Sequence, residues 1–287
     1  MKTHFGICLL ALVVLPAQAQ QAVSGPDVMV YKTVGDRKLT AQVFETEEAK
    51  PSEQRPVSVL LHGGGWVAGS PEWVYDAAKR YASYGAVAVE VEYRLSDQKN
   101  VTPLDAQEDA RDAVRWVRRN AAELGIDAKR VAVYGVSAGG QLAGWLATLG
   151  DSDKSEISAA PNAMILISPA VSVEHDGWFQ RILGNNATAE SVSPSEHIDK
   201  KLPPTIIFHG IADSLVPIAG VQRYCDRAKK FGGECKVYSY EGVGHLFTRK
   251  LDRQEDDFDP DPKVVKDARK KGDEFLAKHG FLPLYTR

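Results

Sequence analysis

The sequence lacks a strong charge of either sign and has no long apolar run. Its 287 residues carry a formal net charge of −3, with 35 basic and 38 acidic side chains. A balance this even gives no electrostatic attraction for nucleic acid or for an anionic membrane surface. The longest apolar run, Phe5 to Leu15, has 11 residues, which is too short to span a bilayer. The sequence therefore predicts neither a nucleic-acid partner nor a membrane span.

The short apolar run has the features of an export signal. A basic start, Met1 to His4, precedes it, and the Ala-x-Ala pattern that ends at Ala19 follows it. This order is typical of a secretory signal peptide. We expect residues 1–19 to be removed and the protein to be periplasmic or secreted. Residues 20–287 show no internal repeat or linker, so they predict one large domain.

Cysteine is also scarce. Beyond Cys8, which lies in the expected signal, the chain has only Cys225 and Cys235. Export would let a disulfide between them persist, but two independent reduced thiols fit the sequence equally well. Nothing in the composition calls for a metal or an organic cofactor, and the oligomeric state is left open.

Apolar segments with high β-propensity alternate with segments of helical periodicity along the chain. This alternation predicts an α/β fold with a mostly parallel central sheet and helices on both faces. Gly125 is expected to end the long second helix. The expected strands are 28–34, 38–44, 57–61, 86–93, 131–134, 163–168, 205–209 and 236–240. The expected helices are 71–84, 105–124, 141–149, 218–231 and 262–279, whereas 169–201 has no strong periodicity.

The pattern Gly135-x-Ser137-x-Gly139 stands between an expected strand and an expected helix. A sharp strand-to-helix turn holds its middle residue in a strained backbone and points that side chain outward. The start of the helix adds free N–H groups and a positive dipole end, which favour a developing oxyanion. Ser137 is therefore predicted to be a nucleophile.

A serine hydroxyl needs a base, and the base is usually oriented by a carboxylate. Of the seven histidines, only His245 follows a glycine-rich turn just past a strand. Asp213 follows the preceding strand in the same way, so we predict it as the acid; Glu241 is an alternative because it is close to His245 in sequence. His209, at a strand end, is expected to pack.

A run of three glycines after strand 57–61 predicts the site for the oxyanion. Glycines let the backbone approach a ligand and direct N–H groups at it. We expect the N–H groups of Gly64 and Gly65 to form one side of an oxyanion hole and that of Ala138 the other. His62 is expected to brace this loop, and Trp66 either lines the acyl pocket or packs.

Together these motifs resemble the α/β-hydrolase superfamily. The segments 62–65, 93–95 and 135–140 resemble the hormone-sensitive-lipase-like esterases. The segments 209–213, 216–217 and 242–245 are similar to bacterial feruloyl and acetyl-xylan esterases. Two departures weaken a lipase interpretation: Val136 stands where the lipase-like branch often has Asp, and few residues precede His62 to form a helical cap.

The resemblance implies a single α/β-hydrolase domain over 20–287 and a serine carboxylesterase activity that needs no cofactor or metal. The expected substrate is a short acyl or aromatic acyl ester, including esters of plant cell-wall saccharides. Trp178 and Phe179 are candidates to stack on it, or else they pack beneath the 169–201 loop. A serine peptidase or lipase of the same fold, and a non-catalytic binding module, are the alternatives.

Overall fold

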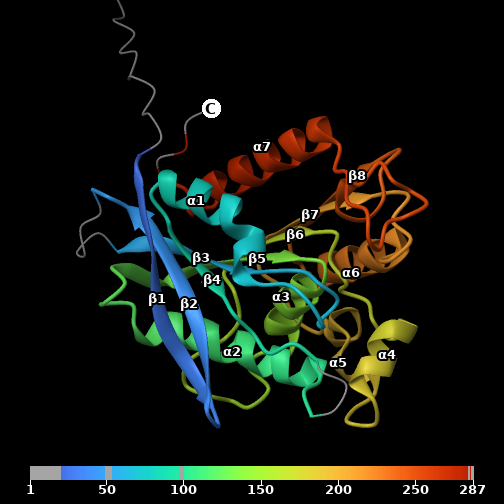
Figure 1. Ribbon diagram of the computed structural model, residues 1–287, viewed down its shortest axis with the longest axis horizontal. Coiled ribbons are helices and arrows are strands. Elements are labelled where there is room, and N and C mark those ends of the chain that lie inside the picture. The colour runs from blue at the N-terminus through green and yellow to red at the C-terminus, as the bar shows by residue number, and fades with distance from the viewer. Residues whose placement is uncertain (1–20, 49–53, 97–99, 284, 286–287) are drawn as a thin grey trace, which may run out of the picture.

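The computed structural model describes residues 21–48, 54–96, 100–283 and 285. The expected signal peptide and its cleavage site lie outside these residues. The structure is an eight-stranded sheet between two layers of helices (Figure 1). The strand order is β1-β2-β4-β3-β5-β6-β7-β8. The hairpin of β1 and β2, and the β2–β4 pair, are antiparallel, whereas the pairs from β4 through β8 are parallel.

The strands and helices agree with the predicted alternation. The strands are β1 Val23–Val34, β2 Arg37–Thr46, β3 Arg55–Leu61, β4 Val87–Val91, β5 Ile126–Val136, β6 Ala163–Ile167, β7 Thr205–Gly210 and β8 Cys235–Tyr240. The helices are α1 Tyr75–Ser83, α2 Pro103–Arg119, α3 Ala138–Thr148, α4 Gly177–Leu183, α5 Ala189–Val192, α6 Ile218–Lys230 and α7 Pro262–Lys278. Three short 3₁₀ turns are η2 Pro71–Val74, η3 Pro194–His197 and η4 His245–Phe247.

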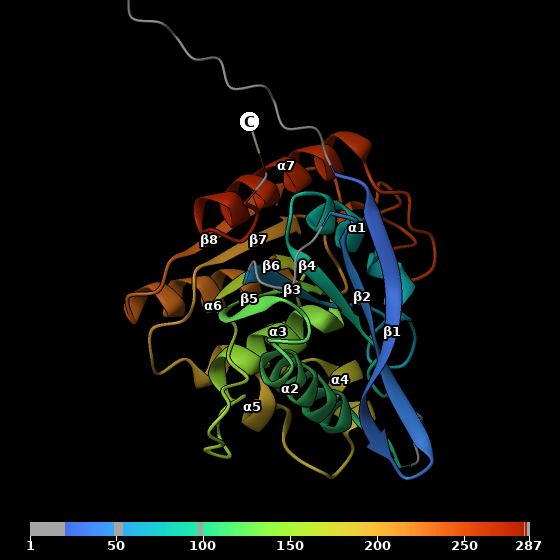
Figure 2. The ribbon, with the colours of Figure 1, turned by 90° about the vertical axis from the view of Figure 1, so that its left-hand side faces the viewer.

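Each face of the sheet has its own apolar core. Because side chains alternate along a strand, Val87, Val89 and Val91 of β4 point to one core, and Ala88 points to the other. Helices α1 and α7 cover one face, and α2, α3 and α6 cover the other (Figures 1 and 2). The prediction of a mostly parallel sheet with helices on both faces is confirmed.

Several predicted bounds differ from those in the structure; β5, for example, begins at Ile126 and not at Val131. Helix α2 begins at a Thr102 capping box but ends at Arg119, so Gly125 does not terminate it. Instead Gly125, with φ of 60°, lies in the turn that leads into β5. The expected helix 71–84 is a 3₁₀ turn followed by α1, and the segment 169–201, which looked aperiodic, contains α4, α5 and η3.

Cys225 of α6 and Cys235 of β8 form a disulfide, with their Cα atoms 5.3 Å apart. The bridge closes a short loop that joins α6 to the last strand. Closing a loop of this length restricts the unfolded chain and stabilises the fold by roughly 2–3 kcal/mol.

We therefore expect the Cys225→Ala/Cys235→Ala double variant to unfold about 4–12 °C below the wild type. Differential scanning calorimetry of the oxidised protein measures this shift. The reduced wild type is the matched control, and it should unfold close to the double variant. If the double variant and the oxidised wild type share one melting temperature, the bridge does not stabilise the fold.

A second buried feature makes stability depend on pH. Glu90 lies on β4 with no exposed surface, and neither of its carboxylate oxygens has a hydrogen-bond partner among the residues that the structure describes. Burial, with a smaller contribution from Glu72, raises the pKa of Glu90 to about 8. In the unfolded chain the pKa of this group is near 4.5, so between about pH 4.5 and pH 8 the folded state binds more protons than the unfolded state does. Stability should therefore fall as the pH rises from about 4.5 to 8.

Glu90→Gln removes this titration, so we expect it to raise the melting temperature at pH 8 by several degrees but to change it little at pH 5. Thermal unfolding followed by circular dichroism at both pH values measures the difference. Glu47→Gln, at an exposed position, is the control. An equal shift at pH 5 and pH 8 would show that Glu90 does not titrate on unfolding.

Candidate active site

Ser137 occupies the sharp turn between β5 and α3 that the sequence predicted. Its backbone has φ of 51° and ψ of −112°, a sparsely populated conformation for a residue with a side chain. The turn is tight because its backbone packs on the end of β3. A Cβ on Gly139 would lie 2.2 Å from the carbonyl oxygen of Leu61, so only glycine fits there.

Ser137, His245 and Asp213 each follow a different strand. The structure brings these three side chains together. The Ser137 hydroxyl donates to His245 Nε2, with the two atoms 3.0 Å apart. On the other side of the imidazole, Nδ1 donates to Asp213 Oδ2 at 2.8 Å. His245 and Asp213 are both buried, at 4% and 5% exposure. This is a hydrogen-bonded chain from a hydroxyl through an imidazole to a buried carboxylate.

Asp213, and not Glu241, is the carboxylate that contacts His245. Its second oxygen, Oδ1, accepts hydrogen bonds from the backbone N–H groups of Leu215 and Val216, at 3.1 and 2.8 Å. Glu241 is exposed on the turn after β8. The two backbone bonds fix the carboxylate so that Oδ2 faces the imidazole.

His209 is fully buried beside this pair, as expected. Its Nε2 donates to the carbonyl oxygen of Val216 at 2.8 Å and lies 3.4 Å from Asp213 Oδ2. Burial lowers the pKa of His209 despite the neighbouring carboxylate. Its ring therefore stays neutral at neutral pH and leaves the negative charge of Asp213 available to His245.

Gln254 is a contributor that sequence reasoning missed. Its Oε1 accepts from the backbone N–H groups of His245 and Ser214, at 2.8 and 3.2 Å, and its Nε2 donates to the carbonyl of Ala212 at 2.8 Å. One buried amide therefore ties the loop that carries the histidine to the loop that carries the aspartate. No local pattern around Gln254, in a charged segment, points to this role.

The glycine loop after β3 lies against the serine turn. Gly64 has φ of 110°, and a Cβ there would lie 2.1 Å from the carbonyl oxygen of Ala68. Within the described part of the chain, the N–H groups of Gly64, Gly65 and Ala138 meet no hydrogen-bond acceptor. These groups are free to bind an oxyanion.

His62 braces this loop from beneath. Its ring stacks on Tyr93 with centroids 4.2 Å apart, and the Tyr93 hydroxyl donates to the His62 carbonyl at 2.8 Å. Burial lowers the pKa of His62. A neutral, stacked imidazole fits the expected supporting role.

The three aromatic candidates have different environments. Trp66 is 3% exposed and packs edge-on against Phe179, with centroids 4.8 Å apart. Phe179 has no exposed surface, so the expectation that it stacks on a ligand is corrected: its ring belongs to the core. Trp178 is 39% exposed, and its Nε1 donates to the carbonyl of Gly65 at 3.1 Å. Trp178 is therefore the one of the three whose ring can meet a ligand beside the oxyanion loop.

Among the residues that the structure describes, no cluster of His, Cys, Asp or Glu has the geometry to hold a metal ion. In the same residues, no helix combines the length and apolarity needed to cross a membrane.

Comparison with known proteins places this fold and site in a family. A model of the alpha/beta hydrolase fold matches residues 58–249. The chain therefore belongs to the α/β-hydrolase family, which confirms the resemblance stated above. Its serine site is of the carboxylesterase type, as in the esterases that resemble it.

Among solved structures, esterase 2 of Thermogutta terrifontis phosphonylated by cyclosarin is 34% identical, with a TM-score of 0.79 over 90% of this chain and 95% of that one. The same esterase with propionate bound gives 34% identity and a TM-score of 0.78, over 90% and 96%.

Two curated relatives match shorter stretches. Esterase LipQ of Mycobacterium tuberculosis is 24% identical over 71% of this chain and 53% of its own length. Endo-1,4-beta-xylanase B of Butyrivibrio fibrisolvens is 30% identical over 58% of this chain and 28% of its own length. The chain thus spans about half or less of these relatives.

Proposed function

We propose that the protein hydrolyses carboxylic esters with short acyl or aromatic acyl groups, outside the cytoplasm, through a covalent acyl-enzyme. The observation that carries this proposal is the chain of hydrogen bonds Ser137–His245–Asp213 beside three free backbone N–H groups. A binding module needs neither a base at the serine nor free donors around it.

In the proposed mechanism, Ser137 Oγ attacks the ester carbonyl carbon while its proton passes to His245 Nε2. Asp213 stabilises the imidazolium, and the N–H groups of Gly64, Gly65 and Ala138 stabilise the oxyanion. The tetrahedral intermediate collapses, the C–O bond to the alcohol breaks, and His245 returns the proton to the departing oxygen. Water then attacks the acyl carbon while one of its protons passes to His245 Nε2. The bond between the acyl carbon and Ser137 Oγ breaks, His245 returns the proton to Oγ, and the acid leaves.

The substrate class rests on the relatives and on Trp178. The related esterase 2 binds propionate, which supports a short acyl group here. The exposed ring of Trp178 beside the Gly65 loop can stack on a sugar or an aromatic ring. The relationship to a xylanase supports esters of plant cell-wall saccharides as natural substrates. The apolar run and cleavage pattern before residue 20 support export.

A substrate panel tests this proposal. Nitrophenyl esters of increasing acyl length, acetylated xylan, methyl ferulate and a nitroanilide are compared at one enzyme concentration. We expect the highest kcat/KM on short acyl or aromatic esters and little activity on the amide. Rates that rise steadily to long acyl chains would identify a lipase, and preferential cleavage of the amide would identify a peptidase. Recovery of the protein from the periplasm or medium with Gln20 at its N-terminus would support export.

A further inference from the structure

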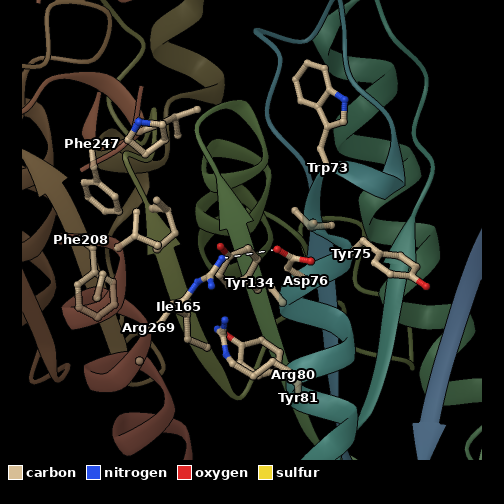
Figure 3. A pocket seen from close by; sticks show the side chains of 18 of the residues that line it. Trp73, Tyr75, Asp76, Arg80, Tyr81, Tyr134, Ile165, Phe208, Phe247 and Arg269 are labelled. Atoms are coloured by element: carbon tan, nitrogen blue, oxygen red, sulfur yellow. Dashed lines mark ion pairs between the residues drawn. The ribbon is translucent and has the colours of Figure 1, made fainter. Parts of the chain in front are cut away.

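The oxyanion loop, residues 62–68, is held by side chains from the helix α4. A hollow between α1 and α7 is lined by Tyr134, Phe208 and Arg269 (Figure 3), and its described lining includes no catalytic residue and no glycine of this loop. Helix α4 packs on the other face of the sheet, in the core that contains Phe179. The contacts that reach the oxyanion loop from outside are therefore sought at α4.

The peptide unit between Gly64 and Gly65 is fixed from within the loop. The carbonyl of Gly64 accepts hydrogen bonds from the N–H groups of Val67 and Ala68, at 3.1 and 3.0 Å. Because a peptide unit is planar and trans, the N–H of Gly65 points away from this carbonyl. That N–H is one of the three free donors of the site. Its direction therefore depends on the conformation that the loop keeps at Gly65.

The next peptide unit, between Gly65 and Trp66, is fixed from α4. Trp178 Nε1 donates to the Gly65 carbonyl at 3.1 Å across 113 residues of sequence, and no other described group donates to that oxygen. Gly65 has φ of 58°, and glycine is the residue with the widest conformational freedom. The bond from Trp178 therefore restricts rotation at a residue whose own side chain imposes no limit.

The residue after Trp178 makes a second contact with the loop. Phe179 packs edge-on against Trp66, whose carbonyl accepts from the N–H of Ser96 at 2.7 Å. Asp176 Oδ1 accepts from the N–H groups of Trp178 and Phe179, at 2.9 and 3.0 Å, and so fixes the start of α4. Two consecutive residues of α4 thus hold two consecutive residues of the loop. The indole N–H of Trp178 has a defined position in this packed unit.

We propose that Trp178 is a positioning residue for the oxyanion hole. Its indole N–H holds the Gly65 carbonyl, which keeps the Gly65 N–H directed at the oxygen of the tetrahedral intermediate. The bond acts through Gly65 and has its largest effect when charge develops on that oxygen. This inference rests on the proposed function and assigns part of its rate to the 169–201 segment. It is separate from any stacking of a ligand on the exposed ring.

Two variants test the role of this hydrogen bond. Trp178→Phe removes the N–H and keeps an aromatic ring. Gln180→Ala is the matched control, because it removes another hydrogen bond from a side chain of α4 to the backbone, from Gln180 Nε2 to the Glu174 carbonyl at 2.8 Å. The kcat and KM of both variants are measured with methyl propanoate, which has no ring, and with phenyl acetate, which has one.

We expect Trp178→Phe to lower kcat about tenfold on both substrates and to leave KM within about twofold. Loss of a complete oxyanion donor costs on the order of 10²–10³ in kcat, and here the donor stays but is less well directed. The melting temperature should change little because the ring lies at the surface. Gln180→Ala should have near wild-type kcat. An unchanged kcat in Trp178→Phe, or an equal loss in Gln180→Ala, would overturn the proposal. A loss confined to phenyl acetate would also overturn it, because Trp178 would then act by stacking alone.

A transition-state analogue separates this inference from the proposed function. Ser137 Oγ adds to the carbonyl carbon of trifluoromethyl ethyl ketone, its proton passes to His245 Nε2, and the carbonyl oxygen becomes an oxyanion with no group leaving. Calorimetric titration should show about tenfold weaker binding to Trp178→Phe and unchanged binding to Gln180→Ala. That result supports the positioning role even if the wild type hydrolyses no ester, which would refute the proposed function alone. Equal binding to Trp178→Phe and to an active wild type refutes the positioning role alone.

Discussion

Replacing Ser137 by alanine is expected to abolish ester hydrolysis, with a loss in kcat on the order of 10⁵–10⁶-fold. The reason is that the hydroxyl supplies the bond to the acyl group, and no other side chain can substitute for it at the turn between β5 and α3. The fold should be retained, since the backbone of the turn is held by Gly139 against β3 and by the Ser137 N–H bond to Ile167. Initial rates with a short nitrophenyl ester measure the loss.

Ser214→Ala is a matched control for this variant. Ser214 is exposed next to Asp213, and its backbone N–H, which contacts Gln254, is unaffected by the change. It should retain activity within a factor of a few. Near-normal hydrolysis by Ser137→Ala would show that another residue is the nucleophile.

Asp213→Asn is expected to lower kcat by on the order of 10⁴-fold while the protein stays folded. The cause follows from the contacts of the carboxylate. Because Oδ1 accepts two backbone N–H bonds, an asparagine oxygen would keep that place and direct its NH₂ group at His245. The imidazole would then carry its proton on Nε2, where it cannot accept the proton of Ser137. The amide also carries no charge to stabilise an imidazolium.

The matched Glu241→Gln variant completes this test. Glu241→Gln should have near wild-type rates because its side chain is exposed and does not contact His245. A larger loss in Glu241→Gln than in Asp213→Asn would mean that the acid has been assigned to the wrong residue.

The positions of Ser137, Asp213 and His245 could be predicted because each follows a recognisable strand. In a parallel sheet the carboxyl ends of neighbouring strands share one edge, so residues distant in sequence converge there. The glycines around Ser137 were informative for a related reason: close approach of β3 leaves no room for a Cβ. The glycine pattern around Ser137 and the topology of the parallel sheet therefore predict the same position for the site.

Other features depend on packing that no local pattern contains. Gln254 acts through contacts with residues 212, 214 and 245, which only the folded chain brings together. The burial of Phe179 depends on how the short helix α4 packs beside Trp66. Helix α2 ends at Arg119, five residues before the expected Leu124, because residues 120–125 form the turn that leads into β5 at Ile126.

The central claim, that Ser137 is the nucleophile of a covalent mechanism, is tested most directly by a fluorophosphonate probe followed by intact-mass and peptide mass spectrometry. We expect one adduct per chain on the peptide that contains Ser137, loss of ester hydrolysis in proportion to labelling, and no adduct in Ser137→Ala. An active enzyme that takes no label, or that carries its label on a different residue, would contradict it.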